Sequence, residues 1–577
     1  MNPPAQILIL DAGGQYCHLI ARKVRDLGVY AEVRASETPA GELASARGLI
    51  ISGGPSSVYD AGSPTVDPAI FTRGQAVLGI CYGQQLMAYL LGGHVEKGEK
   101  GEFGLATVDL AATADPLFAG LSGRQQVWMS HRDLVAGLPE GFSSVGRTET
   151  CPVAAIAAEA RRLYAVQFHP EVVHTTRGRE LLANFVFRVC RCEKDWDASH
   201  RAPLIEQEIR EAAGTRSVFF FVSGGVDSTV AFTLCTRALG ENRLRGVYVD
   251  TGLMREGETD YVRRMAGVTV ECAQEQFLNA LGGVIDPEQK RHIIGEEFVR
   301  VQERVIESRR LLDEQWILGQ GTIYPDTIES GGTAKAALIK THHNRVAGIQ
   351  KLIEAGRIVE PLKSLYKDEV RAVGRELGLP AELLDRHPFP GPGLAIRCLC
   401  SECDAPVRQT AEGWVIPVHS VGVQGDSRSY APVLAISELN HTRATELINR
   451  IAGVNRVVAT VAGHSPADLQ VHASSLTPVR LARLRVADAA VRRLSQESGF
   501  DHRIWQFPVI LIPLGTAACP DSIVLRPIDS VDGMTAQSVA MDAPLLERIS
   551  TELLRQPGIA SVFYDLTHKP PGTIEWE

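Results

Sequence analysis

Short apolar segments that alternate with helical stretches are the feature that most restricts the fold of this 577-residue chain. An amphipathic helix is expected near residues 19–27, and a second helix is expected over residues 229–239, ended by Gly240. Strands that alternate with helices form a mostly parallel sheet covered on both faces. A polar stretch at 192–199 separates two such series, so the sequence predicts two successive parallel-sheet α/β domains. The predicted strands are 7–10, 49–51, 76–80 and 164–168 in the first series, and 218–222 and 244–249 in the second.

The last third of the chain contains a weak internal repeat. Residues 414–418 resemble residues 505–509, and residues 453–458 resemble residues 558–563. Each unit has the order strand, strand, helix, strand, which favours a duplicated α+β module. Chance similarity between short strands is the alternative. The expected domains are residues 1–195, residues 200–396 and an α+β C-terminal region at 397–577.

Charge and composition restrict the class of partner. The net charge of −9 argues against a broad electrostatic surface for nucleic acid or an anionic membrane. No signal peptide is expected at the N-terminus, and no segment approaches the roughly 18 apolar residues of a membrane helix. The eleven cysteines are scattered, without the density of a disulfide scaffold. We therefore expect a cytoplasmic protein that acts on small molecules.

The first chemical motif is Gly79-Ile-Cys81-Tyr-Gly83, which places a cysteine at the junction of a strand and a helix. Small residues on both sides permit the strained turn of a nucleophile elbow. The following helix points its N-terminus at the sulfur, and its dipole favours the reactive thiolate. A buried structural cysteine is the alternative, and the surrounding glycines argue against it.

A cysteine nucleophile needs a base that a third group orients. Phe168-His169-Pro170-Glu171 supplies both, because His169 and Glu171 lie two residues apart at the end of a strand and can project the same way. Backbone N–H groups near Gly54 and of Tyr82 are candidates for an oxyanion hole. Cys81, His169 and Glu171 are thus predicted to form an amide-cleaving triad.

With this triad, residues 1 to about 190 resemble a class I glutamine amidotransferase domain. The resemblance implies hydrolysis of glutamine through a glutamyl thioester, with release of ammonia. It also implies that four further residues help to hold glutamine, namely Gln85, Ser130, His131 and Asp133.

The second motif, Ser223-Gly-Gly-Val-Asp-Ser228, lies between a strand and a helix. Its glycines let backbone N–H groups close on an anion, and the helix dipole favours negative charge there. No Gly-Lys-Ser/Thr ending follows, so this is not a Walker A loop. Asp227 beside phosphates suits a divalent cation or a helix cap. The predicted anion-binding residues are Ser223, Gly224, Gly225, Val226, Asp227 and Ser228.

This loop resembles the pyrophosphate loop of the ATP pyrophosphatase family. The resemblance implies ATP as co-substrate, Mg²⁺ as cofactor with Asp227 as its ligand, and Val249 on the adenosine side. The segment from Gly319 to Asn344 contains paired glycines and Lys340, which is expected on a lid over the phosphates. A solvated basic turn is the alternative reading of Lys340.

Across nearly its whole length, the chain resembles the glutamine-hydrolysing GMP synthase family in its long C-terminal form. The strings that carry this are residues 386–393, residues 421–426 and the tail 569–577. The resemblance implies amination of xanthosine monophosphate (XMP) to GMP with release of AMP and pyrophosphate. The residues that it assigns to XMP are Arg291, Asp426, Gln506, Lys569 and Glu575.

Several alternatives accompany this resemblance. Another adenylating amidotransferase would act on a different acceptor, such as a carboxylate, and an inactive relative would lack the motifs. A second C-terminal copy in one chain could replace the copy of a partner, so both a homodimer and a monomer are expected possibilities. Reduced thiols are favoured over a metal site for Cys398, Cys400 and Cys403, because a fourth ligand is not evident.

Overall fold

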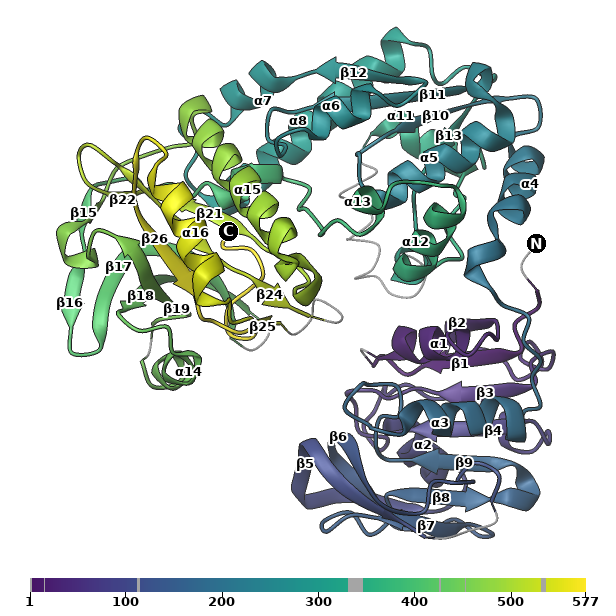
Figure 1. Cartoon of the computed structure of the whole chain (residues 1–577). Coiled ribbons are helices and arrows are strands. Elements are labelled where there is room, and N and C mark those ends of the chain that lie inside the picture. Colours follow the sequence, from purple (N-terminus) through teal and green to yellow (C-terminus); the bar gives the residue numbers. More distant parts are fainter. Residues whose placement is uncertain are drawn as a thin grey trace. The chain divides into compact units, whose positions relative to one another are not determined.

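The computed structural model describes residues 3–14, 16–111, 115–329, 346–424, 427–451, 453–530 and 536–577 (Figure 1). The chain divides into two compact units. Unit 1 comprises Met1–Ile205, Thr322–Ile339 and Lys363–Glu376, and unit 2 comprises Glu206–Gly321, Lys340–Leu362 and Leu377–Glu577. Unit 1 therefore includes two segments from the middle of the sequence.

A nine-stranded sheet forms the centre of unit 1. Its first five strands are mutually parallel and the other four are antiparallel. The predicted strands of the first series are β1, β3, β4 and β9, so the parallel α/β prediction is confirmed here. In sheet order the strands are β2 (Ala31–Ala35), β1 (Ile7–Asp11), β3 (Gly48–Ile51), β4 (Ala76–Ile80), β9 (Leu163–Val166), β8 (Ala155–Ala158), β7 (Ser143–Arg147), β5 (His94–Leu110) and β6 (Gly123–Gly137).

The helices of unit 1 come from distant parts of the sequence. The helix expected near residues 19–27 is α1 (Cys17–Arg25), which buries Ile20, Ala21 and Val24. The others are α2 (Tyr82–Leu90), α3 (Gly178–Ala183), α9 (Tyr324–Glu329) and α12 (Lys367–Glu376). The backbone N–H of Val33 donates to the hydroxyl of Tyr324 at 2.7 Å, which ties α9 to β2.

Unit 2 begins with a five-stranded, all-parallel sheet. Its strand order is β12 (Val268–Cys272), β11 (Leu244–Asp250), β10 (Ser217–Phe221), β13 (Trp316–Gly319) and β14 (Ile358–Val359). Helix α5 (Val226–Leu239) ends at Gly240, whose φ of +80° suits a residue without a side chain, as the sequence predicts. The remaining helices near this sheet are α4 (Ala202–Ala213, at the start of the unit), α6 (Glu258–Arg263), α7 (Gln274–Ala280), α8 (Pro287–Ser308), α11 (Ala347–Glu354) and α13 (Ala381–Leu384).

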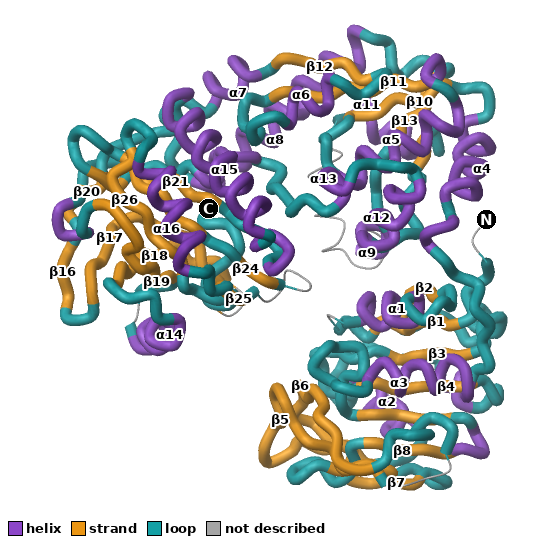
Figure 2. The backbone as a smooth tube through the Cα atoms, in the orientation of Figure 1, coloured by secondary structure: helices purple, strands orange, loops and turns teal. Residues whose placement is uncertain are grey.

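A seven-stranded mixed sheet follows in the same unit, with three further helices (Figure 2). From β17 to β21 the pairings read antiparallel, parallel, antiparallel, parallel, antiparallel, which is the same from either end. The helices are α14 (His441–Arg450), α15 (Pro478–Ser498) and α16 (Ala543–Leu554). In sheet order the strands are β16 (Arg408–Thr410), β17 (Gly413–Gln424), β18 (Ser427–Ile436), β19 (Arg456–Gly463), β26 (Ile559–Asp565), β23 (Asp521–Leu525) and β21 (Val509–Ile512).

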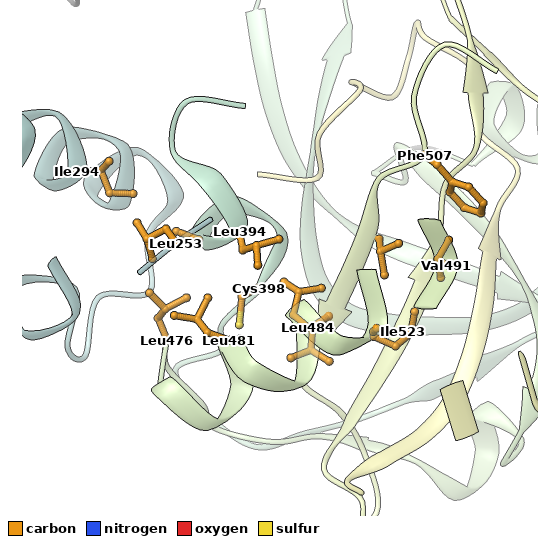
Figure 3. Close-up of a cluster of buried hydrophobic side chains, with 14 of the residues drawn as sticks. Leu253, Ile294, Leu394, Cys398, Leu476, Leu481, Leu484, Val491, Phe507 and Ile523 are labelled. Atoms are coloured by element: carbon orange, nitrogen blue, oxygen red, sulfur yellow. The ribbon is translucent and has the colours of Figure 1, made fainter. Parts of the chain in front are cut away.

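One continuous hydrophobic cluster runs through unit 2, from Phe219 on β10 to Val562 on β26. Figure 3 shows part of it, where Leu253, Leu394 and Cys398 lie near Leu481 and Leu484 of α15. Burial raises the pKa of the Cys398 thiol to about 12, so this sulfur packs as a neutral apolar group. Small strands complete the unit: β15 (Ala405–Pro406), β20 (Gln470–Val471), β22 (Leu514–Gly515), β24 (Ile528–Asp529) and β25 (Gln537–Ser538).

Candidate active sites

Cys81 occupies a sharp turn between β4 and α2. Its φ is +54°, a value that non-glycine residues rarely adopt, so the backbone is strained at this position. The flanking glycines permit the close packing of the turn. A Cβ on Gly79 would lie 2.5 Å from the carbonyl oxygen of Gly83, and one on Gly83 would lie 2.4 Å from the carbonyl oxygen of Ile51. The structure thus has the elbow geometry that the sequence predicts.

His169 and Glu171 lie beside this cysteine and are buried. The Nδ1 of His169 is 2.7 Å from Oε1 of Glu171, which leaves Nε2 for the sulfur of Cys81. Burial by itself would lower the pKa of His169. The charge of Glu171 and the sulfur of Cys81 overcome that effect and raise this pKa well above its ordinary value. The arrangement is a cysteine, an imidazole that holds a proton and an orienting carboxylate.

The candidate oxyanion donors lie next to the elbow. Tyr82 is the first residue of α2, so its N–H has no acceptor within the helix and points toward the N-terminal end. A Cβ on Gly54 would lie 2.5 Å from the carbonyl oxygen of Ala12 and 3.3 Å from the ring of Tyr82. The loop that contains Gly54 therefore packs directly against the start of α2.

Three of the four residues expected to hold glutamine are joined by hydrogen bonds, and the fourth, Ser130, contacts Cys81. The amide of Gln85 donates to the carbonyl oxygen of Asp133 at 2.7 Å, and Nδ1 of His131 lies 3.0 Å from the same oxygen. The carbonyl oxygen of Ser130 faces the sulfur of Cys81 at 3.7 Å. The side chains of Gln85 and His131 thus support the backbone of β6.

Sequence reasoning missed Gln167, whose amide donates to the sulfur of Cys81 at 3.6 Å. No motif in the sequence marks Gln167 by itself. However, the sequence places Gln167, His169 and Glu171 at intervals of two residues. Side chains at this spacing point to the same side of an extended chain, so the spacing could have indicated Gln167 as a site residue. Tyr16, whose ring lies edge-on to His169 with centroids 5.2 Å apart, was also missed, and no pattern in the sequence points to it.

The second predicted motif forms a compact loop between β10 and α5. The N–H of Ser223 donates to the hydroxyl of Ser228 at 3.0 Å, and the N–H of Gly225 donates to the hydroxyl of Ser223 at 3.2 Å. Gly224 has a φ of +73°. Val226 and Asp227 begin α5, so the N-terminus of that helix adjoins the loop, an arrangement suited to phosphate.

The surroundings of this loop include both predicted and unpredicted residues. Val249 is buried near the carboxyl end of β11, and β11 is the parallel neighbour of β10, so both following loops lie at one sheet edge. Arg386, missed as a site residue, donates to the carbonyl oxygen of Gly224 at 2.6 Å. Lys340 lies outside the described residues.

The residues expected to bind XMP are gathered only in part. Arg291 on α8 donates to a main-chain oxygen of Glu577, and Glu575 accepts two hydrogen bonds from Arg397, at 2.6 and 2.8 Å. Arg291 therefore contacts the C-terminal tail, to which Glu575 itself belongs. Gln506 pairs with Ile528 and Lys569 pairs with Ala536 in separate backbone bridges. Asp426 lies outside the described residues.

Two buried arginines hold the tail in place. Arg456 donates to the carbonyl oxygens of Thr573 and Glu575, and Arg526 donates to those of Thr567, Thr573 and Ile574. Both guanidinium groups pair with the single carboxylate of Asp565, at 2.9 and 2.7 Å. The tail is thus fixed by Arg456 on β19, by Asp565 on β26 and by Arg526, which directly follows β23.

In the part of the chain that the structure describes, none of the helices combines the length and apolar character needed to cross a bilayer.

Comparison with known proteins assigns families to three parts of the chain. Glutamine amidotransferase class-I matches residues 8–189, NAD synthase matches residues 198–268, and the GMP synthase C terminal domain matches residues 494–576. A probable glutamine-hydrolyzing GMP synthase of Leptospira interrogans is 42% identical, over 99% of this chain and 99% of that one. The glutamine-hydrolyzing GMP synthase of Caldicellulosiruptor saccharolyticus is 40% identical, over 99% of each chain. That of Streptomyces coelicolor is 39% identical, over 100% of this chain and 98% of its own. With these matches over nearly its full length, the chain belongs to the glutamine-hydrolysing GMP synthase family.

Proposed function

We propose that this chain aminates XMP to GMP with ammonia taken from glutamine, at the expense of ATP, which leaves as AMP and pyrophosphate. The observation that carries the proposal is the presence of two complete motifs in one chain of this family. One is the buried Cys81, His169 and Glu171 triad, and the other is the loop from Ser223 to Ser228.

In the glutaminase reaction, the sulfur of Cys81 attacks the side-chain amide carbon of glutamine. The N–H groups of Tyr82 and Gly54 bind the oxyanion of the tetrahedral intermediate. His169, which Glu171 keeps protonated, transfers its proton to the departing ammonia. A water molecule, deprotonated by His169, then cleaves the thioester and releases glutamate. Gln85, Ser130, His131 and Asp133 hold glutamine in place.

In the synthetase reaction, the purine O2 of XMP attacks the α-phosphorus of ATP, and pyrophosphate leaves. The loop residues Ser223, Gly224, Gly225, Val226, Asp227 and Ser228 hold the phosphates, Val249 lies on the adenosine side, and Lys340 neutralises charge as pyrophosphate leaves. Ammonia then attacks C2 and displaces AMP.

Asp227 is proposed as the protein ligand of Mg²⁺. The donor set fits that ion, since Mg²⁺ is commonly held by one or two carboxylates together with substrate phosphates. Asp227 lies in the first turn of α5, directly after the phosphate loop, and the serine hydroxyls are close by. When bound, Mg²⁺ supplies positive charge at the phosphate oxygens.

Arg291, Asp426, Gln506, Lys569 and Glu575 are proposed to bind XMP. Arginine and lysine suit the 5′-phosphate, and the carboxylates and the amide suit ribose hydroxyls and purine edges. The contact of Arg291 with the tail that contains Lys569 and Glu575 supports a site built around that tail.

The three-domain division at 1–195, 200–396 and 397–577, with a duplicated C-terminal module, is also part of the proposal. The symmetric pairing pattern from β17 to β21 supports the duplication, because each half contributes two antiparallel strands and a third, parallel strand. A monomer and a homodimer remain the two proposed states, to be separated by light scattering, and the proposed location is the cytoplasm.

The test is GMP formation from XMP, ATP and Mg²⁺, with glutamine or ammonium as nitrogen source, in the wild type and in Cys81→Ala. The wild type should use both sources. Cys81→Ala should lose glutamine-dependent synthesis by about 10⁴-fold, since it lacks the nucleophile, and should keep the reaction with ammonium. Absence of GMP with either nitrogen source, while another acceptor in place of XMP still yields AMP and pyrophosphate, would reject XMP as the acceptor.

A further inference from the structure

A second cluster of cysteine, histidine and carboxylate lies in unit 1, apart from the triad. Its members are Glu102 on β5, His131 on β6 and Cys151, which follows β7. Glu102 and His131 are directly paired across the antiparallel β5–β6 ladder. One ligand atom of each residue lies within 4.8 Å of the other two. The side chains of His131 and Glu102 are 3% and 13% exposed, and Cys151 is fully buried.

The imidazole of His131 faces an oxygen acceptor at each nitrogen. Nδ1 is 3.0 Å from the carbonyl oxygen of Asp133, and Nε2 is 3.1 Å from Oε2 of Glu102. A neutral imidazole has one N–H, which can satisfy only one of these acceptors. Both acceptors are satisfied either by an imidazolium, which has two N–H groups, or by a neutral ring with Nδ1–H donating to the carbonyl and a cation between Nε2 and Glu102. That outer hydrogen bond is the usual arrangement for a metal-bound histidine.

Glu102 is oriented as metal-bound carboxylates commonly are. The hydroxyls of Thr148 and Thr150 both donate to Oε1 at 2.6 Å, and this leaves Oε2 directed toward His131. Burial acts to raise the pKa of Glu102, but hydrogen bonds from His131 and the two threonines lower it to about 2.

The same turn positions Cys151. Its N–H donates to the hydroxyl of Thr148 at 2.9 Å, and the N–H of Thr148 donates to the carbonyl oxygen of Cys151 at 2.9 Å. Burial, followed by the charge of Glu102, raises the pKa of this thiol to about 12. A cation in the cluster reverses that preference, because a metal-bound thiol loses its proton to solvent and binds as thiolate.

We propose that Glu102, His131 and Cys151 bind one Zn²⁺ ion, with water as the fourth ligand. A mixed sulfur, nitrogen and oxygen set suits zinc better than Mg²⁺ or Ca²⁺, which select oxygen ligands. Tetrahedral zinc places such ligand atoms about 3.4–3.6 Å apart. Binding therefore separates Nε2 of His131 and Oε2 of Glu102 slightly, from 3.1 Å, and draws any atom pair at the 4.8 Å limit together by about 1.2–1.4 Å. The thiolate and carboxylate charges together balance the two charges of the ion.

The position of the cluster gives the ion a role in the glutaminase site. His131 lies between Ser130, whose carbonyl faces the sulfur of Cys81, and Asp133, whose carbonyl binds both His131 and Gln85. A bound ion ties the turn at 148–151 to β6 and fixes the segment 130–133. This role rests on the proposed function, whereas binding of the ion does not.

The test measures metal content and the spectrum of bound cobalt in the full-length protein. The Cys81→Ala background removes the other cysteine–histidine pair as a source of signal. Protein purified without chelator should contain about one equivalent of zinc. After exchange, Co²⁺ should show the visible bands of a tetrahedral ion and a near-ultraviolet thiolate charge-transfer band.

Cys151→Ser should lose the thiolate band and bind zinc at least about tenfold more weakly. Cys235→Ser is the matched control, because Cys235 is also fully buried but lies on α5 in unit 2, and this variant should keep both signals. Glu102→Gln, which keeps the shape of the side chain, provides a second variant if Cys151→Ser fails to fold.

Two results would overturn the proposal. One is wild-type protein that takes up neither Zn²⁺ nor Co²⁺ in excess, which would leave Glu102 and His131 as an ion pair only. The other is an unchanged thiolate band in Cys151→Ser. Removal of zinc should also raise KM for glutamine and leave synthesis from ammonium unchanged. If only that effect is missing, the ion is bound but its role in the glutaminase site is rejected.

Discussion

At the scale of single residues, the protonation of His169 depends on its two neighbours. Glu171 lies 2.7 Å from Nδ1, and both the carboxylate and the sulfur of Cys81 act against the effect of burial on this imidazole. His169 therefore holds its proton up to a higher pH than an ordinary histidine, and in the proposed mechanism this is the proton that the departing ammonia takes. Glu171 is the part of this arrangement that can be changed without removing the nucleophile.

Glu171→Gln should lower the pKa of His169, because the amide keeps the shape of the side chain but not its charge. Glutaminase activity requires the protonated imidazole, so the alkaline limb of kcat/KM against pH should move to lower pH. The rate should fall by about 10²–10⁴-fold, and synthesis from ammonium should not change. An alkaline limb at the same pH as in the wild type would show that Glu171 does not raise the pKa of His169.

At the scale of secondary structure elements, α9 and α12 belong to unit 1 although they lie more than a hundred residues beyond its first segment, which ends at Ile205. Arg25 of α1 is the centre of this packing. Its guanidinium lies 4.7–5.0 Å from the ring centroids of four aromatic residues and 3.1 Å from the carboxylate of Glu369 on α12. The four aromatic residues are Tyr30, Trp196, Tyr324 and Tyr366.

Arg25→Ala should destabilise this unit by about 3–5 kcal/mol at neutral pH, because it leaves the buried Glu369 carboxylate without its partner. Burial already raises the pKa of Glu369, and loss of Arg25 should raise it further. A carboxyl group with a raised pKa in the folded state stabilises the fold below its unfolded pKa, and this contribution is lost as the pH rises through the folded pKa. The destabilisation should therefore be smaller near pH 5 than near pH 8.

Urea unfolding of the two variants Arg25→Ala and Arg22→Ala at both pH values checks this prediction. Arg22 is on the same helix and pairs with Asp368 at 3.1 Å, but these side chains are 38% and 36% exposed. An exposed pair of this kind contributes about 0–1 kcal/mol. If both variants lost the same free energy of unfolding, the buried cluster around Arg25 would not contribute more to stability than the exposed pair.

At the scale of the whole molecule, the C-terminal tail belongs to the folded core of unit 2. Lys290 pairs with Glu577 at 2.6 Å, and Arg397 pairs with Glu575 at the same distance. Both cationic side chains are fully buried. The last residues of the chain thus neutralise charges that come from α8 and from the segment before Cys398.

Removal of Glu575, Trp576 and Glu577 should abolish GMP synthesis from glutamine and from ammonium, because the buried Lys290 and Arg397 would lose the carboxylates that they pair with at 2.6 Å. Each broken pair costs about 3–5 kcal/mol. Glutamine hydrolysis should persist, since the triad lies in unit 1, and calorimetry should show a lowered transition for unit 2. Loss of hydrolysis together with synthesis would argue that the two units do not fold independently.

The sequence by itself determined the features that depend on neighbouring residues. The strand before Cys81, the glycines around it, the spacing of His169 and Glu171, and the loop at 223–228 are each contiguous. Their chemistry follows from local backbone geometry, which a short segment sets on its own. The parallel α/β architecture also follows from the sequence, because the alternation of strands and helices is a local pattern.

Only the tertiary structure decided which distant side chains meet. Arg397 on Glu575 and the aromatic group around Arg25 are not marked by any motif. The string 386–393 and the spacing of Gln167 were visible, but neither showed that Arg386 reaches the loop at 223–228 or that Gln167 reaches the sulfur. Burial of a charge requires a partner, but that partner can come from any part of the chain that the fold brings near. The sequence supplies the charges and the aromatic rings, and the packing of the folded chain selects their partners.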